Sequence, residues 1–332
     1  DKLINIFKGK SVLVAGGTGM VGVPLTKMLK KLGANVFVAS LDSISKEQRG
    51  IIKKFYKVDL INVQNCIKVT KNKDYVINLL GVTGSPKINY TNPGSFMMSN
   101  LYCAVNLLYA SQINKVKRYL YTSTYGVYGK KLKMKEDNVW KDFPSEHDKY
   151  AGWAKRMGEL QVEAYSKEFN FDGLYVVRPA NIYGPNLNFN PKNSMVVASL
   201  IKRVCDNENP LIVWGDGSNI RDFVYSDDVA GSILKVIQKN ITKPINIGSG
   251  KGTSIKNLIK LIVSSKNIKN KPKIIFDKTK KSGDKKRVLD TSFAESKNIK
   301  NKTKLKDGIN KTIKWYLANK DNLNKKFNYF SK

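Results

Sequence analysis

Three glycines spaced three residues apart follow the first apolar run of the chain. They belong to the segment GGTGMVG, between the run Ser11–Ala15 and an amphipathic stretch that ends at Leu32. Between a strand and a helix, Gly16 lets the chain turn with positive φ, Gly19 lets a phosphate approach the backbone, and Gly22 lets the helix pack on the sheet. The helix N-terminus then attracts the phosphate. We therefore expect a dinucleotide to contact Gly16, Gly19, Met20, Val21 and Gly22.

Polar side chains follow the second and third apolar runs, where the nucleoside of such a cofactor would lie. Ser40 ends the second run, and Asp42 stands close enough to reach a ribose diol. No Arg or Lys is adjacent to Ser40 to bind a 2′-phosphate, which favours NAD over NADP. Asp59 and Leu60 follow the third strand, where a loop would contact adenine, although an Asp in such a turn serves about as often to hold the turn.

Short apolar runs alternate with longer amphipathic stretches through the first half of the chain. This alternation predicts an α/β fold with a doubly wound parallel sheet, of the Rossmann type. The buried strands are predicted at Ser11–Ala15, Asn35–Ser40, Tyr75–Leu80, Arg118–Ser123 and Gly173–Val177.

The pattern loosens after Pro185, which predicts a smaller, mixed C-terminal domain for the substrate. We expect a dinucleotide-binding domain over residues 1–182, with a returning segment near 222–248, and a substrate-binding domain over 183–332. The predicted later elements are a helix near Ser194–Cys205, strands at Leu211–Val213 and Pro244–Ile247, and a helix at Gly308–Asn319 with Trp315 and Leu317 on its apolar face.

The composition of the 332 residues, 41% hydrophobic and 26% charged, is typical of a soluble globular protein. No apolar run approaches the roughly 18–20 residues that span a bilayer, and no signal core opens the chain, so we expect a cytoplasmic protein without a membrane partner. The net charge of +33 comes mostly from scattered Lys, which codon bias explains without a nucleic-acid partner. Three distant cysteines and the single His147 suggest neither a disulfide framework nor a metal site.

Further motifs extend the pattern of the glycine turn. They are Asp59–Leu60, Leu79–Val82, Asn100–Leu108, Tyr121–Gly129, Arg178–Pro185, Trp214–Phe223 and Gly283–Asp290. Together they resemble the extended short-chain dehydrogenase/reductases of the NAD-dependent epimerase/dehydratase family, and within it most of all the GDP-L-fucose synthase group. The resemblance covers almost the whole chain. It implies an enzyme that oxidises or reduces the sugar of a nucleoside-diphosphate sugar, and it adds Leu80 and Gly81 to the cofactor contacts.

In this family a Ser or Thr polarises the reacting oxygen, a Tyr moves its proton, and a Lys four residues later holds the nicotinamide ribose and lowers the pKa of the Tyr. The resemblance assigns the first role to Thr124 and the third to Lys155. Tyr150 lies five residues before Lys155, so on a regular helix the two side chains point about 140° apart. Either an irregular first turn brings Tyr150 into the site, or the site works without the usual acid/base; both remain open.

Two departures from the family pattern bear on the reaction. GDP-L-fucose synthases carry a Cys after the catalytic Ser/Thr and a His after the Tyr-Gly-Pro turn, and this pair inverts C3 and C5. Tyr125 and Asn186 take those places here, and an amide cannot take up a proton near pH 7. We therefore expect simple redox chemistry at C4.

The substrate diphosphate needs cations that stay charged. The resemblance places Arg221, Lys286 and Arg287 at the diphosphate, Thr124 at the sugar, and Asn181 at the sugar or a phosphate. We expect an NAD-dependent oxidoreductase acting at C4 of a nucleoside-diphosphate sugar, a GDP-linked manno-configured hexose or heptose. The alternatives are a 4-epimerase, a GDP-L-fucose synthase-type epimerase/reductase, and a non-catalytic dinucleotide or nucleic-acid binder.

The resemblance also implies a homodimer, because family members commonly pair through the two helices that follow the fourth and fifth strands. Apolar residues at helical spacing suit this use, although burial in the chain's own core explains them equally well. These residues are Leu101, Val105, Leu108, Leu160 and Ala164.

Overall fold

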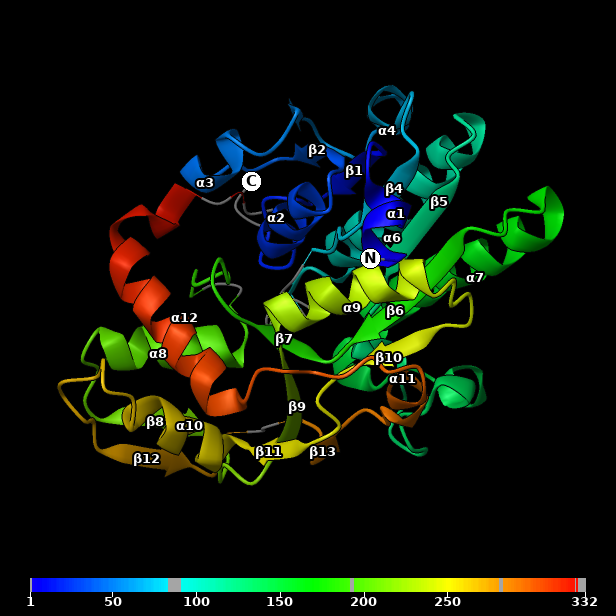
Figure 1. Ribbon diagram of the computed structural model, residues 1–332. Coiled ribbons are helices and arrows are strands. Elements are labelled where there is room, and N and C mark those ends of the chain that lie inside the picture. Colours follow the sequence, from blue (N-terminus) through cyan, green and yellow to red (C-terminus); the bar gives the residue numbers. More distant parts are fainter. Residues whose placement is uncertain (1, 83–90, 192–193, 281–282, 326, 328–332) are drawn as a thin grey trace.

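The computed structural model describes residues 2–82, 91–191, 194–280, 283–325 and 327, and its largest sheet has seven strands (Figure 1). These are β1 (Ser11–Ala15), β2 (Asn35–Ser40), β3 (Lys54–Lys57), β4 (Tyr75–Asn78), β5 (Arg118–Thr122), β6 (Leu174–Pro179) and β10 (Ile245–Ile247). They lie in the order β10-β6-β5-β4-β1-β2-β3, and each neighbouring pair is parallel. The predicted doubly wound α/β fold is confirmed.

Helices cover both faces of this sheet, as Figure 1 shows. One face carries α1 (Lys2–Phe7), α2 (Gly22–Lys31) and α9 (Ser226–Gln238), and the other carries α4 (Val63–Thr70), α6 (Pro93–Ile113) and α7 (Lys149–Phe169). The strand β1 explains this layering. Its Val12 and Val14 belong to the core under α2 and α9, whereas Leu13 and Ala15 belong to the core under α4 and α6. A strand buried on both faces needs a continuous apolar sequence, which β1 has.

A second, smaller part of the molecule lies at the lower left of Figure 1. Its mixed sheet consists of β7 (Asn181–Tyr183), β9 (Ile220–Tyr225), β11 (Gly252–Ser254) and β13 (Lys286–Arg287). A parallel pair, β8 (Leu211–Trp214) and β12 (Ile274–Asp277), lies beside it. The helices α8 (Val196–Cys205), α10 (Ile255–Val263) and α12 (Leu305–Asn319) pack together around a core in which Ile201, Leu258 and Ile313 are fully buried.

Short elements complete the described chain and shape the connections. They are α3 (Lys46–Arg49), α11 (Ser292–Ser296) and the 3₁₀ turns η1 (Tyr125–Val127), η2 (Glu136–Lys141), η3 (Glu146–Asp148) and η4 (Lys320–Lys325). Several predicted boundaries shift by one to three residues. The strand β4 ends at Asn78, two residues early, and α12 begins at Leu305, where its buried face is set by Ile309, Ile313 and Tyr316, with Trp315 and Leu317 at the margin.

The chain passes from the main sheet to the smaller part and then returns. After β9 in the mixed sheet, α9 packs against α2, and β10 becomes the edge strand beside β6. The main sheet therefore includes residues far apart in sequence. Within the described ranges, no helix is both long and apolar enough to span a membrane.

Candidate active site

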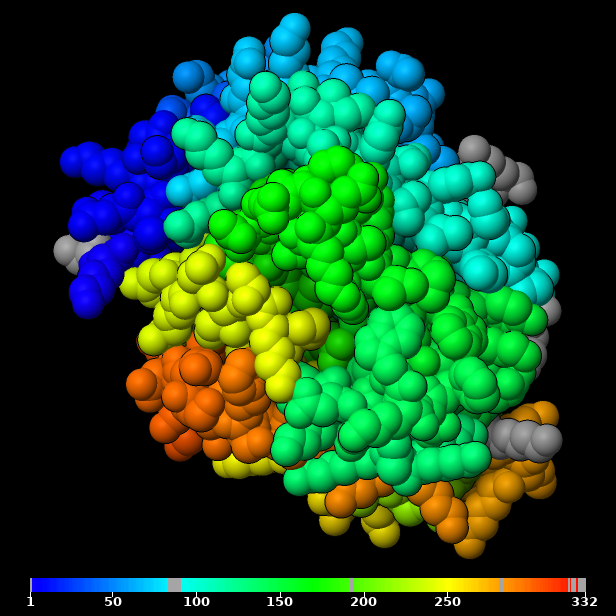
Figure 2. All heavy atoms as spheres, turned by 90° about the vertical axis from the view of Figure 1, so that its right-hand side faces the viewer, coloured from blue at the N-terminus to red at the C-terminus, as the bar shows by residue number. Residues whose placement is uncertain are grey.

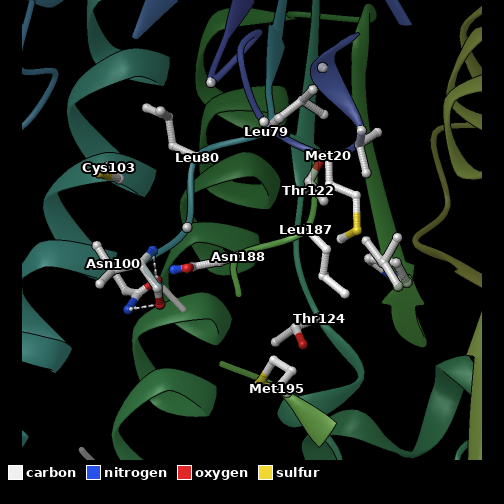
Figure 3. Close-up of a pocket in the computed structure, with 18 of the residues that line it drawn as sticks. Met20, Leu79, Leu80, Asn100, Cys103, Thr122, Thr124, Leu187, Asn188 and Met195 are labelled. Carbon is white, nitrogen blue, oxygen red and sulfur yellow. Dashed lines mark hydrogen bonds between the residues drawn. The ribbon is translucent and has the colours of Figure 1, made fainter. Parts of the chain in front are cut away.

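A cavity of about 470 Å³ lies at the carboxyl ends of the parallel strands, where ligands bind in doubly wound sheets. Figure 3 shows its lining, from Met20 in the glycine turn to Thr124 and Met195 at the far end. Most of the predicted site residues meet here. Those that line the cavity are Gly16, Gly19, Met20, Val21, Gly22, Ser40, Asp42, Leu60, Leu80, Gly81, Thr124, Lys155 and Asn181. Those that lie outside its lining are Asp59, Tyr150, Arg221, Lys286 and Arg287.

The glycine turn has the geometry that the sequence predicts. Gly16 has a φ of +77°, and its N–H donates to Ala39 O, which joins the turn to β2. A Cβ at Gly22 would lie 2.5 Å from the backbone of Gly17, so only glycine lets α2 begin this close to the turn. The N-terminus of α2 therefore borders the cavity and can receive a phosphate.

The two polar residues after β2 mark one end of the cavity. The Ser40 hydroxyl lies 2.6 Å from the Thr18 hydroxyl, and Asp42 Oδ1 accepts from the backbone N–H of Phe327. Asp59 has a different place, because its Oδ1 accepts from the N–H of Ile61 and holds the turn before α4. The structure brings Asp42 to the cavity and leaves the Asp59 carboxylate in a turn.

Lys155 is buried at the other end of the cavity and joins two strand ends. Its Nζ donates to Leu80 O at 2.8 Å, after β4, and to Thr122 O at 2.9 Å, in β5. The ammonium also lies near Gly81, where a Cβ would come within 3.4 Å of Nζ. Burial lowers the pKa of Lys155 to about 8, so the group stays cationic at neutral pH but gives up its proton more readily than an exposed Lys.

Thr124 caps the turn η1 and lines the cavity beside Lys155. Its Oγ1 accepts from the N–H of Gly126 at 3.2 Å. The preceding Ser123 donates to the buried carboxylate of Glu159, which forms a two-bond ion pair with Arg178. This network fixes the backbone under Thr124 from α7 and β6.

Tyr150, five rather than four residues before Lys155, lies away from the cavity. α7 is a continuous α-helix from Lys149, so no bulge rotates Tyr150 toward Lys155. Its ring instead lies by the Lys149 ammonium, 5.9 Å from Nζ to the ring centroid. Ala151, four residues before Lys155, lines the cavity in its place, together with Asp148. The structure does not bring Tyr150 into the cavity.

Tyr125 and Asn181 form a bonded pair in the cavity lining. The Tyr125 hydroxyl donates to Asn181 Oδ1 at 2.9 Å, and Asn181 Nδ2 donates to Asp222 O. Burial raises the pKa of Tyr125 to about 12, so the phenol is neutral at physiological pH. Asn186, at the other departure from the family pattern, also lines the cavity.

The basic residues predicted for the diphosphate lie outside this lining. Arg287 is buried, with NH1 on Tyr128 O and NH2 on Tyr125 O and Asp148 Oδ2. These bonds attach β13 to the loop after β5, so Arg287 holds two parts of the fold together. Arg221 is half-buried and donates to Asp284 O, whereas Lys286 is exposed.

Sequence reasoning missed several residues that shape the site. Asn100, which stands within a family motif, lines the cavity and holds the loop after β4 through Val82, as the dashed bonds in Figure 3 show. The Ser123–Glu159–Arg178 network gave no local signal, because its members lie far apart in the chain. Within the described residues, no three His, Cys, Asp or Glu side chains are grouped to hold a metal ion.

Comparison with known proteins identifies the family. A family model described as the NAD dependent epimerase/dehydratase family matches residues 12–248, more than half of the chain. The chain belongs to this family. As a member of the epimerase/dehydratase family, it is an NAD(P)-dependent enzyme, which excludes the non-catalytic alternative.

Several relatives in the epimerase/dehydratase family align along nearly their full length. The probable GDP-L-fucose synthase 1 of Oryza sativa subsp. japonica is 28% identical, over 94% of this chain and 93% of its own. The GDP-L-colitose synthase of Yersinia pseudotuberculosis is 26% identical, over 94% of this chain and 99% of its own. Among solved structures, the UDP-glucose 4-epimerase of Thermotoga maritima superposes with a TM-score of 0.79 and 26% identity, over 93% of this chain and 99% of that one.

The cavity fits the NAD(P) of an epimerase/dehydratase enzyme. It runs from Asp42, past the N-terminus of α2, to Lys155. Gly16 lines this path, and its φ of +77° is one that other residues rarely adopt. Gly16, Gly19 and Gly22 would hold the pyrophosphate and Lys155 the nicotinamide ribose.

Proposed function

We propose that the chain is an NAD-linked oxidoreductase that acts at C4 of a GDP-linked, manno-configured hexose or heptose. The observation that carries this proposal is the meeting of Thr124 and Lys155 with the glycine turn in one cavity. The GDP-sugar class rests on the relatives, since those named for GDP-L-fucose and GDP-L-colitose align with 94% of this chain.

The side chains divide the work of the reaction. When bound, the nicotinamide exchanges a hydride with the sugar carbon. Thr124 donates a hydrogen bond from its hydroxyl to the C4 oxygen and orients it. Lys155 holds the ribose, and the carbonyls of Leu80 and Thr122 keep its ammonium in place. Residues 1–182 would hold the cofactor and 183–332 the sugar nucleotide, with the segment near 222–248 returning to the first part.

Tyr125 and Asn186, which replace the Cys and His of GDP-L-fucose synthases, support redox at C4 without inversion at C3 and C5. The Tyr125 hydroxyl donates a hydrogen bond to Asn181, and burial raises the pKa of Tyr125 to about 12. This phenol therefore exchanges protons poorly near pH 7. Asn186 has an amide that neither takes up nor releases a proton in that range.

NAD is the proposed cofactor rather than NADP. Asp42 lines the adenosine end, and a carboxylate there repels a 2′-phosphate while it accepts from a ribose diol. Among the described residues that line the cavity, Lys155 is the sole Lys or Arg, and it lies at the nicotinamide end.

We also propose a homodimer formed through α6 and α7. Figure 2 shows these helices together on one face. On α6, Met98, Tyr102, Tyr109 and Ile113 are each at least 40% exposed, and Leu160 on α7 is 45% exposed. Leu108, which we considered for this interface, is instead buried in the chain's own core. Tyr102→Lys with Leu160→Lys should convert the dimer to a monomer in light scattering, while Trp214→Lys should not.

The function is tested with a panel of sugar nucleotides. The purified protein is incubated with NAD+ or NADP+ and GDP-D-mannose, GDP-L-fucose, GDP-L-colitose or UDP-glucose, and products are identified by mass spectrometry and NMR. Reduced cofactor with a 4-keto GDP-sugar supports the proposal. A C4 epimer without net reduction of cofactor indicates a 4-epimerase instead, and turnover of UDP-glucose alone rejects the GDP class.

A further inference from the structure

Asp148 stands directly before α7, but its carboxylate does not cap the helix. An Asp at this position ordinarily accepts from the N–H groups of the first turn, which stabilises a helix by about 1 kcal/mol. Here the side chain makes no capping bond. Its Oδ2 instead accepts from Arg287 NH2 at 3.0 Å and from Ser145 Oγ at 3.4 Å. The carboxylate is turned from the helix end and lines the cavity.

Asp148, directly before α7, borders the same cavity as Lys155. Ala151 and Lys155, four residues apart in the helix, line the cavity beside it. The methyl group of Ala151 leaves open the space that a larger side chain would fill. A carboxylate one turn before Ala151 can therefore face a sugar held at Thr124.

Contacts around Gly126 place Asp148 at the reacting end. A Cβ at Gly126 would lie 3.3 Å from Asp148 Cγ and 3.3 Å from Thr124 Cγ2, so these two side chains flank one backbone position. In the part of the chain that the structure describes, Oδ1 of Asp148 has no hydrogen-bond partner, so one carboxylate oxygen is available to a ligand.

The other side chains of this end are poor proton carriers. The Tyr125 hydroxyl donates a hydrogen bond to Asn181 Oδ1, and burial raises the pKa of the Cys103 thiol to about 12. Asn181 and Asn186 are amides. Asp42, the other carboxylate in the described lining, lies at the adenosine end. Lys155 also lies at this end, but its ammonium is held by the carbonyls of Leu80 and Thr122. Asp148 is thus the group at this end with an oxygen available to exchange a proton with a ligand.

We propose that Asp148 is the catalytic acid/base of this site, in place of the family's tyrosine; this rests on the proposed function. In the oxidising direction, Asp148 Oδ1 accepts the proton of the C4 hydroxyl while C4 releases its hydride to the nicotinamide. The O–H and C–H bonds break and the C4 carbonyl forms. In the reducing direction C4 takes a hydride back from the nicotinamide, and the protonated carboxyl returns the proton to the C4 oxygen.

The surrounding charges suit this task. Arg287 from β13 stabilises the carboxylate, while Asp284 before β13 opposes its charge. The other charged or titratable neighbours are His147 in η3, Tyr125 in η1 and Arg221 in β9. Desolvation outweighs the arginine and raises the pKa of Asp148 above its ordinary value. A raised pKa brings a carboxyl nearer to the working range of a general acid/base.

The test compares Asp148→Asn with Glu146→Gln, an exposed neighbour that pairs with Lys149. Each is assayed for oxidation of the panel member that the wild type turns over, and for NADH binding by titration. Asp148→Asn should lower kcat about 100-fold or more, the range of a positioned acid/base, with NADH affinity unchanged. Glu146→Gln should keep wild-type kcat. Formate should restore turnover to Asp148→Ala, because a small carboxylate can replace the lost base but not a lost structural bond.

A pH profile gives a second readout that needs no Asp148 variant. Wild-type kcat/KM for sugar oxidation should fall on the acid side as Asp148 takes a proton, and His147→Gln should keep this limb. The inference is overturned if Asp148→Asn keeps turnover within about tenfold of wild type, if Tyr150→Phe alone shows the large loss, or if His147→Gln removes the acid limb. A wild type inactive on the whole panel rejects the proposed function first.

Discussion

The two ends of the cavity are built by different means. At the cofactor end, backbone geometry dominates: a positive φ at Gly16, a Gly22 with no room for a Cβ, and the N-terminus of α2. At the reacting end, side chains from distant parts of the chain meet: Thr124 after β5 and Lys155 in α7. The first end depends on residues that are close in sequence, and the second depends on tertiary packing.

This difference predicts two kinds of sensitivity to mutation. A change at the reacting end removes a functional group from an intact fold, so it affects turnover more than stability. A change in the glycine turn disturbs the backbone, so it affects cofactor affinity and stability together. Turnover, cofactor affinity and stability, measured on the same variants, distinguish these two kinds of sensitivity.

The largest effect is expected at the reacting end. Thr124→Ala and Lys155→Met should each lower turnover by about 10²–10⁴-fold, because each removes a group that positions the reacting atoms. Single-turnover kinetics with the active panel member would measure this loss. Thr124→Ser should restore most of the activity, since it keeps the hydroxyl. Retention of turnover within about twofold by both first variants would remove these residues from the mechanism.

A smaller but mixed effect is expected at the cofactor end. Gly22→Ala places a Cβ 2.5 Å from the Gly17 backbone, so it should destabilise the fold by roughly 1–3 kcal/mol and weaken NADH binding. Gly231→Ala in α9, where a Cβ meets nothing within 4 Å, is the matched control and should stabilise by about 0.5–1 kcal/mol. Chemical denaturation and NADH titration measure both. Equal effects of the two substitutions would contradict the backbone account.

Cofactor choice should respond to one carboxylate. Asp42→Asn should weaken NADH binding by about tenfold and NADPH binding less, because the amide lacks the charge that repels a 2′-phosphate. Titration of both cofactors with wild type and variant gives the ratio. If the wild type binds NADPH more tightly than NADH, the proposed NAD preference is wrong.

A separate effect, visible only at alkaline pH, concerns the stability of the ligand-free protein. Below pH 8 Lys155 is charged in both the folded and the unfolded protein, so folding must desolvate a charge. Between pH 8 and the ordinary Lys pKa of 10.5, Lys155 is protonated only in the unfolded chain. Rising pH in this window should therefore stabilise the wild type relative to Lys155→Met, by up to about 3 kcal/mol. Denaturation at several pH values in this window measures the free energy of unfolding of both proteins. The same dependence on pH in both would contradict the lowered pKa of Lys155.

The same contrast explains what could be predicted from sequence. The parallel-sheet fold class and the glycine turn follow from apolar runs and spacing of the kind that β1 and α2 carry locally. The absence of Tyr150 from the cavity follows from helical periodicity once α7 proves regular. Arg287 matches a family position, yet its burial against Tyr125 and Asp148 depends on how β13 meets η1, more than 130 residues apart in sequence. Such contacts have no local signature.

The edge strand β10 also bears on how the protein is made. The apolar face of α9, with Val229, Ile233 and Ile237 buried, and the edge strand itself both come after the chain has left the main sheet. At roughly 5–20 residues per second, a ribosome needs about 3–13 s to go from Ile182 to Ile247. During that interval the nascent main sheet has an unpaired β6 edge and an uncovered core face. Biosynthesis of this enzyme therefore includes a period of several seconds in which exposed apolar surface and an unpaired strand edge favour aggregation.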